Sequence, residues 1–326
     1  MDTLCCTIQP CSAFGTPLVG DTLFGQLCWA LRHRFGKGWL VERLQGYTEG
    51  RPFVVISDAF PQGFFPLPAV PSRFFHESSE DRKTLKKKRW LAVAEMDTDF
   101  REWQRRAKSD HEAADIILGD SGFSSDNAAL QKITAQPHNS INRATGTTGE
   151  GMFAPYSMSQ IWFHPAMRFD LHMLFDTERI SKEELTAALT DIGQSGYGRD
   201  ASIGLGKFNL VGEVKRVSLA NINKANAWLT LAPCAPQGLG FDGGKSYYRP
   251  FTRFGRHGST LALAGSPFKR PVLLAATGGV FTPAGETSQV RRLFIGQGLG
   301  GVSPSQPETV SQGYAPVQGI FLEDSQ

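Results

Sequence analysis

The sequence has only five cysteines in 326 residues, and no two of them form a CxxC pair. An odd number without that pair favours neither a disulfide framework nor a zinc ribbon, so we expect reduced thiols, partly in the core. No apolar run approaches the ~18 residues that cross a bilayer. The first residues lack the basic and apolar segments of a signal peptide. We therefore expect a cytoplasmic protein with no membrane contact.

Net charge is also small, because 34 Lys and Arg residues face 31 Asp and Glu residues and leave only +3. This value excludes a protein whose whole surface attracts nucleic acid. An RNA or DNA partner must then bind where positive charge is concentrated locally. Hydrophobic residues make up 40% of the chain, enough for a substantial core. The length accommodates two domains of ordinary size or one large domain.

Glycine, by contrast, is abundant at 35 residues and concentrated in short segments, which indicates backbone that approaches something closely. Residues 196–201 match GxGxxA and residues 296–301 match GxGxxG, so a dinucleotide site has to be considered. That fingerprint follows a strand and opens a helix. Here the first segment follows a predicted helix, and the second runs into a proline-rich stretch. Lys207 completes no P-loop, because Phe208 stands where Ser or Thr is required.

The apolar spacing predicts the order strand, helix, strand, insertion, strand, helix, strand. The first helix has Asp21 as its expected N-cap and ends near Gly36. The second begins with Ser181 and Glu184 as a capping box, and Gly193 closes it. This βαββαβ order is that of a ferredoxin-like fold. Strands are expected at 1–9, 52–56, 152–175 and 207–217, around an insertion of some helix and mobile loops at about 63–137.

Beyond about residue 225 the sequence predicts only strands, at 226–232, 245–254, 259–264, 270–281, 289–295 and 312–322. We therefore expect an α+β protein of two domains. Residues 1–217 form the first domain, which contains the insertion. Residues 218–326 form a second domain that is richer in strands.

Two polar segments are candidates for contact with nucleic acid. Residues 138–153 are spaced by glycines between strand-like flanks, which predicts a projecting hairpin with Arg143 near its base. The alternative is an exposed hairpin without a ligand. Residues 196–207 can place bare amide groups, Arg199 and Lys207 against a phosphodiester backbone. Here the alternative is a glycine-rich turn that binds nothing.

Several segments together resemble the RAMP superfamily of CRISPR-associated proteins, and within it most closely the fourth subunits of type III-A Csm effectors, a Cas5-like group. They are residues 20–31 (GDTLFGQLCWAL), 138–153, 196–208, Tyr248-Arg249, 265–271 (GSPFKRP) and 312–317 (QGYAPV). The resemblance implies tandem ferredoxin-like (RRM-like) domains with a protruding β-hairpin thumb. It also implies a protein without catalysis that grips the 5′ tag of the crRNA. Such a subunit joins the large Cas polymerase/nuclease subunit to the Csm backbone filament and meets target RNA only indirectly.

Carried over by position, the resemblance implies RNA contacts from the hairpin and from the glycine-rich loop, and a later basic cluster is a further candidate. The hairpin would displace a nucleotide of the guide, with Arg143 on a phosphate, and Phe14, Tyr197 and Phe254 would stack on bases. Taken alone, each of these aromatic residues is more often a core residue. The implied RNA-binding residues are His138, Asn139, Asn142, Arg143, Thr145, Gly196, Tyr197, Gly198, Arg199, Ser202, Gly204, Gly206, Lys207, Phe14, Arg253, Phe254, Arg256, Lys269 and Arg270.

The run from Arg82 to Arg89 holds six cations in eight residues and no acid. Such runs are usually solvated faces, and RNA contact is the alternative. If the run binds RNA, charge reversal at Lys86, Lys87 and Lys88 weakens retention of the crRNA and flattens its salt dependence.

Two further functions stay open at the level of sequence. A Cas6-like endonuclease that cuts repeat RNA without metal needs a general acid and base, and His33 is the one candidate. Asp58 has no second acid or histidine nearby, and His164 and His172 lie eight residues apart, which gives no metal chelate. The other function is a protein-interaction scaffold without RNA affinity. We expect no cofactor and no metal.

Overall fold

The computed structural model describes residues 1–326 except 78–79, 124–127, 220–224, 264, 286–291 and 323–326. Its α-helices are α1 (Gly20–Phe35), α2 (Lys37–Arg43), α3 (Arg82–Lys87), α4 (Trp103–Arg106), α5 (Asp110–Asp120) and α6 (Lys182–Ser195). Its strands are β1 (Asp2–Pro10), β2 (Val54–Pro61), β3 (Phe64–Pro66), β4 (Lys88–Ala92), β5 (Lys108–Ser109), β6 (Lys132–His138), β7 (Tyr156–Trp162), β8 (Phe169–Phe175), β9 (Phe208–Arg216), β10 (Ala227–Thr230), β11 (Pro250–Arg253), β12 (Val272–Ala275), β13 (Val280–Phe281), β14 (Phe294–Leu299) and β15 (Ser311–Ile320). None of the described helices is long and apolar enough to span a bilayer.

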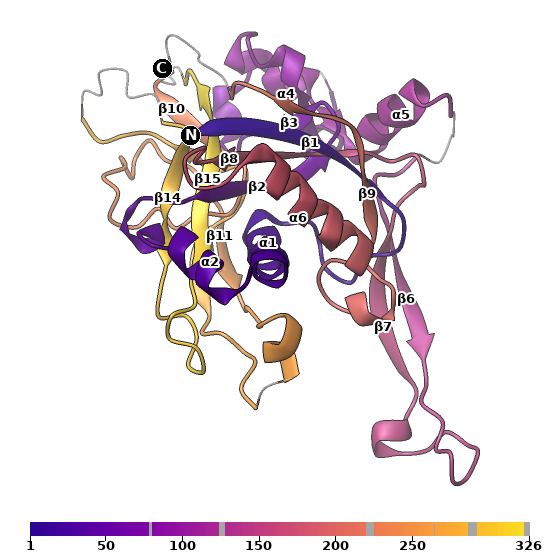
Figure 1. The fold of residues 1–326 in the computed structure, drawn as a ribbon. Coiled ribbons are helices and arrows are strands. Elements are labelled where there is room, and N and C mark those ends of the chain that lie inside the picture. The colour runs from indigo at the N-terminus through magenta and orange to yellow at the C-terminus, as the bar shows by residue number, and fades with distance from the viewer. Residues whose placement is uncertain (78–79, 124–127, 220–224, 264, 286–291, 323–326) are drawn as a thin grey trace.

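The first sheet has the strand order β2-β8-β1-β9, and every neighbouring pair in it is antiparallel. Numbered along the predicted βαββαβ unit, this is the order 2-3-1-4 of a ferredoxin-like sheet, so the predicted α+β class is confirmed. Helices α1 and α6 pack side by side against the sheet (Figure 1). Buried and partly exposed residues nearly alternate along β1, as expected for a strand with one covered face.

The two helices of this unit begin in different ways. In α6 the predicted capping box is present, because Ser181 accepts from the Glu184 amide and Glu184 from that of Ser181. The helix does not close at Gly193 but continues to Ser195, and Gly196 follows with φ +100°. A Cβ at Gly193 would lie 2.2 Å from the carbonyl oxygen of Phe208 in β9, so this glycine serves close packing rather than a helix end.

Helix α1 begins at Gly20 and is not capped by Asp21, which corrects the sequence prediction. Asp58, in the middle of β2, accepts the Gly20 amide at 2.8 Å. The side chain of Asp21 instead binds Arg253, from the second half of the chain. The start of α1 therefore depends on contacts between distant segments, which local sequence patterns do not contain.

The described residues between 63 and 120 form helices, short strands and the loops that connect them, and so include the helix expected in the insertion. Strands β3, β4 and β5 form a three-stranded antiparallel sheet, accompanied by α3, α4 and α5. Phe75, Phe100 and Trp103 are buried and in ring contact with one another. We call residues 63–120 the insertion subdomain.

In the second half, a further antiparallel sheet has the order β13-β10-β15-β14. Strand β15 lies against both α1 and β2, and Gln312 on β15 pairs with both the amide and the carbonyl group of Ile56 on β2. A strand was expected at 259–264, but residues 259–263 form a 3₁₀ helix, and residue 264 lies outside the described residues. The predicted strand at 270–281 is two strands, β12 and β13. The start of the one predicted at 289–295 lies outside the described residues, and β14 begins at Phe294.

Candidate RNA interface

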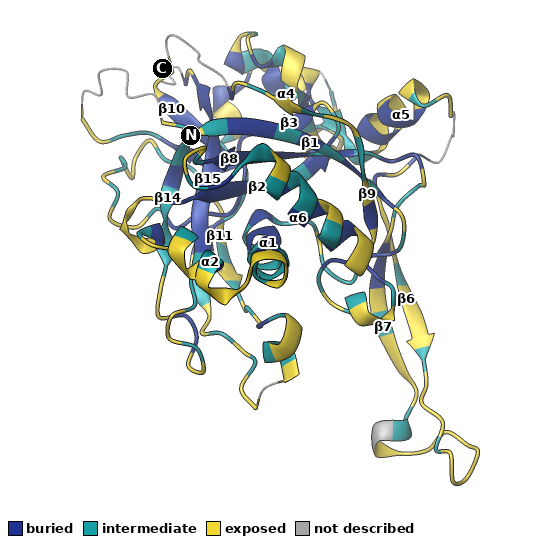
Figure 2. Cartoon of the chain, viewed as in Figure 1, coloured by how far each residue is buried: buried dark blue, intermediate teal, exposed yellow. Residues whose placement is uncertain are grey.

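Strands β6 and β7 form a two-stranded antiparallel hairpin that projects from the body of the protein (Figure 1). Figure 2 shows that most of its surface is exposed. The predicted hairpin at 138–153 is the distal part of this element, since the stem is built from 132–138 and 156–162. The first strand of the stem therefore falls within the range assigned to the insertion. We call residues 132–162 the hairpin.

The sequence predicted Arg143 near the base of the hairpin, but Arg143 lies at the tip. A bridge between Asn142 and Thr147 closes the turn that contains it. The Asn142 side chain accepts the Ala144 amide at 2.9 Å, and the hydroxyl groups of Thr145 and Thr147 are 3.0 Å apart. These polar side chains stabilise the turn itself. Arg143 is exposed, and within the described residues no carboxylate lies at ion-pair distance from it.

One face of the stem carries aromatic and cationic side chains together. The register pairs Lys132 with Trp162, and His138 with Tyr156, on the same face. The His138 and Tyr156 rings are stacked at 5.5 Å. Tyr156 is 50% and Trp162 45% exposed, and Asn139 at the end of the stem is exposed too. Exposed rings beside cations are what single-stranded RNA requires of a protein surface.

The loop at 196–207, which we call the glycine loop, uses most of its amide groups in hydrogen bonds within the protein. The amides of Gly196, Tyr197, Gly204 and Gly206 all donate to carbonyl groups, as do others in the loop. The Lys207 amide donates to Ser12 and the Arg199 amide to Thr16. An amide that is already paired is not free to bind a phosphate. The amides of Gly198, Asp200, Ala201 and Ser202 donate no hydrogen bond within the described residues, so the predicted amide contacts with phosphate are limited to these four.

The glycines of this loop are required by close backbone packing. A Cβ at Gly206 would lie 2.1 Å from the carbonyl oxygen of Tyr197, and one at Gly198 would lie 2.6 Å from Thr16. Both residues also have positive φ angles, as does Gly204, which has open space around it. The glycine loop is thus held against residues 12–17 by contacts between main chains.

Arg199 joins the glycine loop to the hairpin. Its guanidinium donates to the carbonyl oxygen of Ser159 on β7 at 2.5 Å, and it lies 3.1 Å from Asp200. Its charge is partly neutralised, and its first role is to fix the hairpin's orientation. Lys207 and Ser202 are exposed, and within the described residues Lys207 has no carboxylate at ion-pair distance.

Phe14 and Tyr197 cannot stack on bases in this structure, because neither ring is exposed. Phe14 has 0% exposure and packs edge-on against Phe163 at 5.3 Å. Tyr197 is equally buried, and its hydroxyl group donates to Pro17 at 2.8 Å. These two residues belong to the core beneath the glycine loop, so their proposed stacking role is wrong.

The basic cluster at 253–270 is divided by the fold. Arg253 forms a bidentate ion pair with Asp21 at 2.6 and 2.7 Å. Lys269 turns inward and donates to Ser311, and its burial lowers the pKa of its ammonium group. These two cations stabilise the protein and are not available to RNA, which corrects the prediction.

The other members of that cluster remain at the surface. Phe254 is 77% exposed. Arg256 lies over the ring of Phe268. Phe268 was not predicted as an RNA-binding residue, although it belongs to the GSPFKRP segment at 265–271. Arg270 donates to the carbonyl oxygen of Gly301 at 3.2 Å and is exposed. Together they offer ring faces and guanidinium groups to a single strand.

The candidate catalytic residues occupy structural positions. His33 contacts the hydroxyl group of Ser259 at 3.0 Å at the end of α1. His172 is buried against Phe65, and burial lowers its pKa to about 4. Ring nitrogen Nδ1 of His164 accepts the Ala166 amide. Within the described ranges no group of His, Cys, Asp and Glu side chains is arranged to hold a metal ion.

Asp58 is partly buried at the junction of three segments. Its carboxylate accepts from the amide of Gly20 and, at 2.5 Å, from the hydroxyl group of Thr277. Burial raises its pKa to about 7, although both hydrogen bonds act in the opposite direction. It joins the start of α1 to the second half of the chain.

Comparison with known proteins identifies a family and a fold. The family model of the RAMP superfamily matches residues 12–209. No curated protein matches the chain. A chain in the crystal structure of the Csm3-Csm4 subcomplex in the type III-A CRISPR-Cas interference complex has a TM-score of 0.60 at 15% identity, over 98% of this protein and 100% of that chain.

Chains of two Csm1-Csm4 cassette structures are also similar. For the cassette in complex with cA4 the TM-score is 0.56 at 14% identity, over 99% of both chains. For the cassette in complex with pppApA it is 0.54 at 15% identity, over 99% of this protein and 100% of that chain. At these identities the likeness establishes a shared fold.

The close packing of the glycine loop predicts different costs for two substitutions. Gly204→Ala places a side chain at φ +100° in open space and should cost ~1–2 kcal/mol of stability. Gly206→Ala has the same backbone penalty and also a clash with Tyr197, so it should cost a further ~1–3 kcal/mol. Urea unfolding of both variants measures the difference, and equal losses would show that the backbone at Tyr197 and Gly206 can move apart within the loop.

Asp58 predicts an unusual pH dependence of stability. Its folded-state pKa of about 7 lies above the ordinary value of 3.8. At a pH between these two values, the carboxyl group therefore takes up a proton when the protein folds. Stability then falls as pH rises from about 4 to about 7. Asp58→Asn mimics the protonated carboxyl, so its stability relative to the wild type should rise by up to about 4 kcal/mol over that interval.

The difference in unfolding free energy between Asp58→Asn and the wild type cancels the contributions of other titrating groups, including His172. Unfolding free energies at pH 4.5, 6 and 8 provide the measurement. A difference that stays constant with pH would contradict a raised pKa for Asp58.

Proposed function

The chain belongs to the RAMP superfamily, and from that premise we propose that it is a crRNA-binding subunit of a type III CRISPR effector complex. It grips the 5′ tag of the guide and does not cut it. The observation that carries this proposal is the hairpin, an exposed ribbon of aromatic and cationic side chains that Arg199 fixes to the glycine loop through Ser159.

Two kinds of exposed side chain would bind the RNA, cations at its phosphates and aromatic rings at its bases. Arg143 at the hairpin tip and Lys207 at the end of the glycine loop are exposed cations without acidic partners in the described chain, suited to phosphates. Phe254 and Tyr156 supply ring faces for unstacked bases. Such contacts hold a single strand with little dependence on its sequence.

Partners of this subunit follow from the fold. Chains with the same fold occur in the Csm3-Csm4 subcomplex and in Csm1-Csm4 cassettes. We propose that this protein likewise bridges the large polymerase/nuclease subunit to the backbone filament of a type III-A complex. The exposed apolar residues of the hairpin, such as Ile133 at 63%, are consistent with a surface that a complex covers.

Binding without cleavage is favoured by the roles of the two catalytic candidates. His33 is directed to Ser259, and Asp58 is partly buried with both oxygens accepting hydrogen bonds. A Cas6-like endonuclease would instead cut repeat RNA in EDTA and lose that cleavage in His33→Ala. A scaffold without RNA affinity would purify free of small RNA, with a low 260/280 absorbance ratio.

The proposal predicts the behaviour of the double variant R143A/K207A. Loss of two phosphate contacts should weaken binding of an RNA that carries the tag, and the slope of log K against log salt should become shallower by about 1.4. Filter binding between about 50 and 200 mM salt measures both.

A matched control is the variant R34A/R51A, which removes two exposed arginines that are ion-paired on other surfaces. It should leave the slope unchanged. Equal effects of the two double variants would reduce the role of Arg143 and Lys207 to general charge and would overturn their assignment.

A further inference from the structure

The run of six cations at 82–89 separates into two groups in the structure. Lys88 is only 8% exposed in its side chain, and its ammonium group donates to Glu80 and to the carbonyl oxygen of Arg105. Arg89 pairs with Asp110 at 3.2 Å. These two cations hold the insertion subdomain together.

The other four cations lie on α3 and have no such partners. Arg82, Lys83, Lys86 and Lys87 are all exposed. Among the residues with described positions, none of the four lies within ion-pair distance of a carboxylate. The nearest acid in sequence, Asp81, uses its side chain to accept the Lys83 amide at the start of the helix.

This arrangement costs the helix stability. Arg82 and Lys86 are four residues apart, as are Lys83 and Lys87, so each pair places like charges side by side on the helix surface. Each such pair destabilises a helix by ~0.2–0.5 kcal/mol. The position of Lys86 and Lys87 in the last turn, where the helix dipole favours cations, offsets only part of this.

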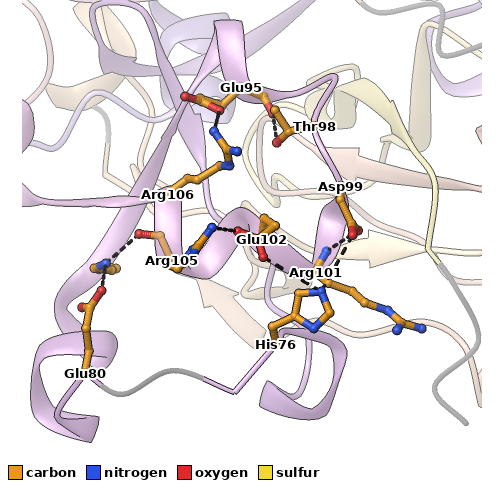
Figure 3. A network of polar contacts seen from close by, with 10 residues as sticks. His76, Glu80, Glu95, Thr98, Asp99, Arg101, Glu102, Arg105 and Arg106 are labelled. Carbon is orange, nitrogen blue, oxygen red and sulfur yellow. Dashed lines mark hydrogen bonds and ion pairs between the residues drawn. The ribbon is translucent and has the colours of Figure 1, made fainter.

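Elsewhere in the insertion subdomain, cations pair with neighbouring acids. Arg105 pairs with Glu102 and Arg106 with Glu95 (Figure 3). Residues 63–137 contain twelve Lys and Arg and twelve Asp and Glu residues, so the segment has no net charge. Without the four cations of α3 the segment has eight Lys and Arg and twelve Asp and Glu residues, so the positive charge on α3 is a local concentration in an otherwise acidic segment.

We propose that α3 is a docking helix for the phosphate backbone of an RNA strand, separate from the hairpin and the glycine loop. Four Lys and Arg side chains bind phosphates whatever the RNA sequence, because no side chain on α3 is placed beside them to recognise bases. A protein partner fits the surface less well, because protein interfaces are depleted in lysine and require apolar or aromatic anchors. Between these cations α3 offers only Thr84 and the half-buried Leu85.

The test is binding of poly(U) without a tag to the full chain, measured by fluorescence anisotropy at several salt concentrations. The variant K86E/K87E should lose about tenfold in affinity at 0.1 M salt, and its slope should become shallower by about 1.4, the value for two phosphate contacts. The conservative variant K86R/K87R should keep both values, because the charge is retained.

The variant K37E/K215E makes the same change in net charge at two exposed lysines on other elements. Its poly(U) binding should stay well above that of K86E/K87E. Equal losses in these two variants would overturn the proposal, since only total charge would matter. Poly-glutamate that binds α3 while poly(U) affinity is unchanged in K86E/K87E would also overturn it, in favour of an acidic protein partner.

This inference rests on the proposed function only in taking RNA as the ligand, and the two fail separately. Loss of tag binding in R143A/K207A with normal poly(U) binding assigns the lost contacts to the hairpin and the glycine loop. Loss of poly(U) binding in K86E/K87E concerns α3.

Discussion

The candidate interface depends on the close approach of two main-chain segments, residues 12–17 and the glycine loop. A Cβ at Gly15 would lie 2.5 Å from the carbonyl oxygen of Arg199, and the Gly206 amide donates to the carbonyl oxygen of Ala13 at 2.7 Å. This packing accompanies the hydrogen bonding of most amides of the loop and buries the rings of Phe14 and Tyr197. It also fixes the backbone from which Arg199 reaches the hairpin. The glycines therefore contribute to RNA binding through structure, by positioning the elements that meet the ligand.

Local sequence patterns predicted the parts of the fold that local interactions determine. The capping box of Ser181 and Glu184 spans three residues, and the order of strands and helices follows from apolar spacing. The rejection of a nucleotide site at the glycine loop depended only on what precedes and follows it. In each case the deciding contact lies within a few residues in sequence.

Long-range contacts account for the corrections. Asp21 and Arg253 are 232 positions apart and form an ion pair. Because of this pair, Asp21 does not cap α1 as expected, and Arg253 is not part of the RNA surface as expected. Lys88 differs from Lys86 and Lys87 only in its place at the start of β4, where Glu80 and Arg105 surround it. The stem of the hairpin was missed for a related reason, since Lys132–His138 is recognisable as a strand only through its pairing with β7. Ile133 and Thr134, both β-branched, were the available signal.

The central claim is that the hairpin and the surface around Phe254 meet the tag of a guide RNA. Ultraviolet crosslinking of a tagged crRNA in the intact effector complex, followed by mass spectrometry of this chain, tests it most directly. The account predicts crosslinks from tag nucleotides to peptides within 132–162 and to the peptide containing Phe254 and Arg256. Tag crosslinks confined to other subunits, with none to these peptides, would contradict it.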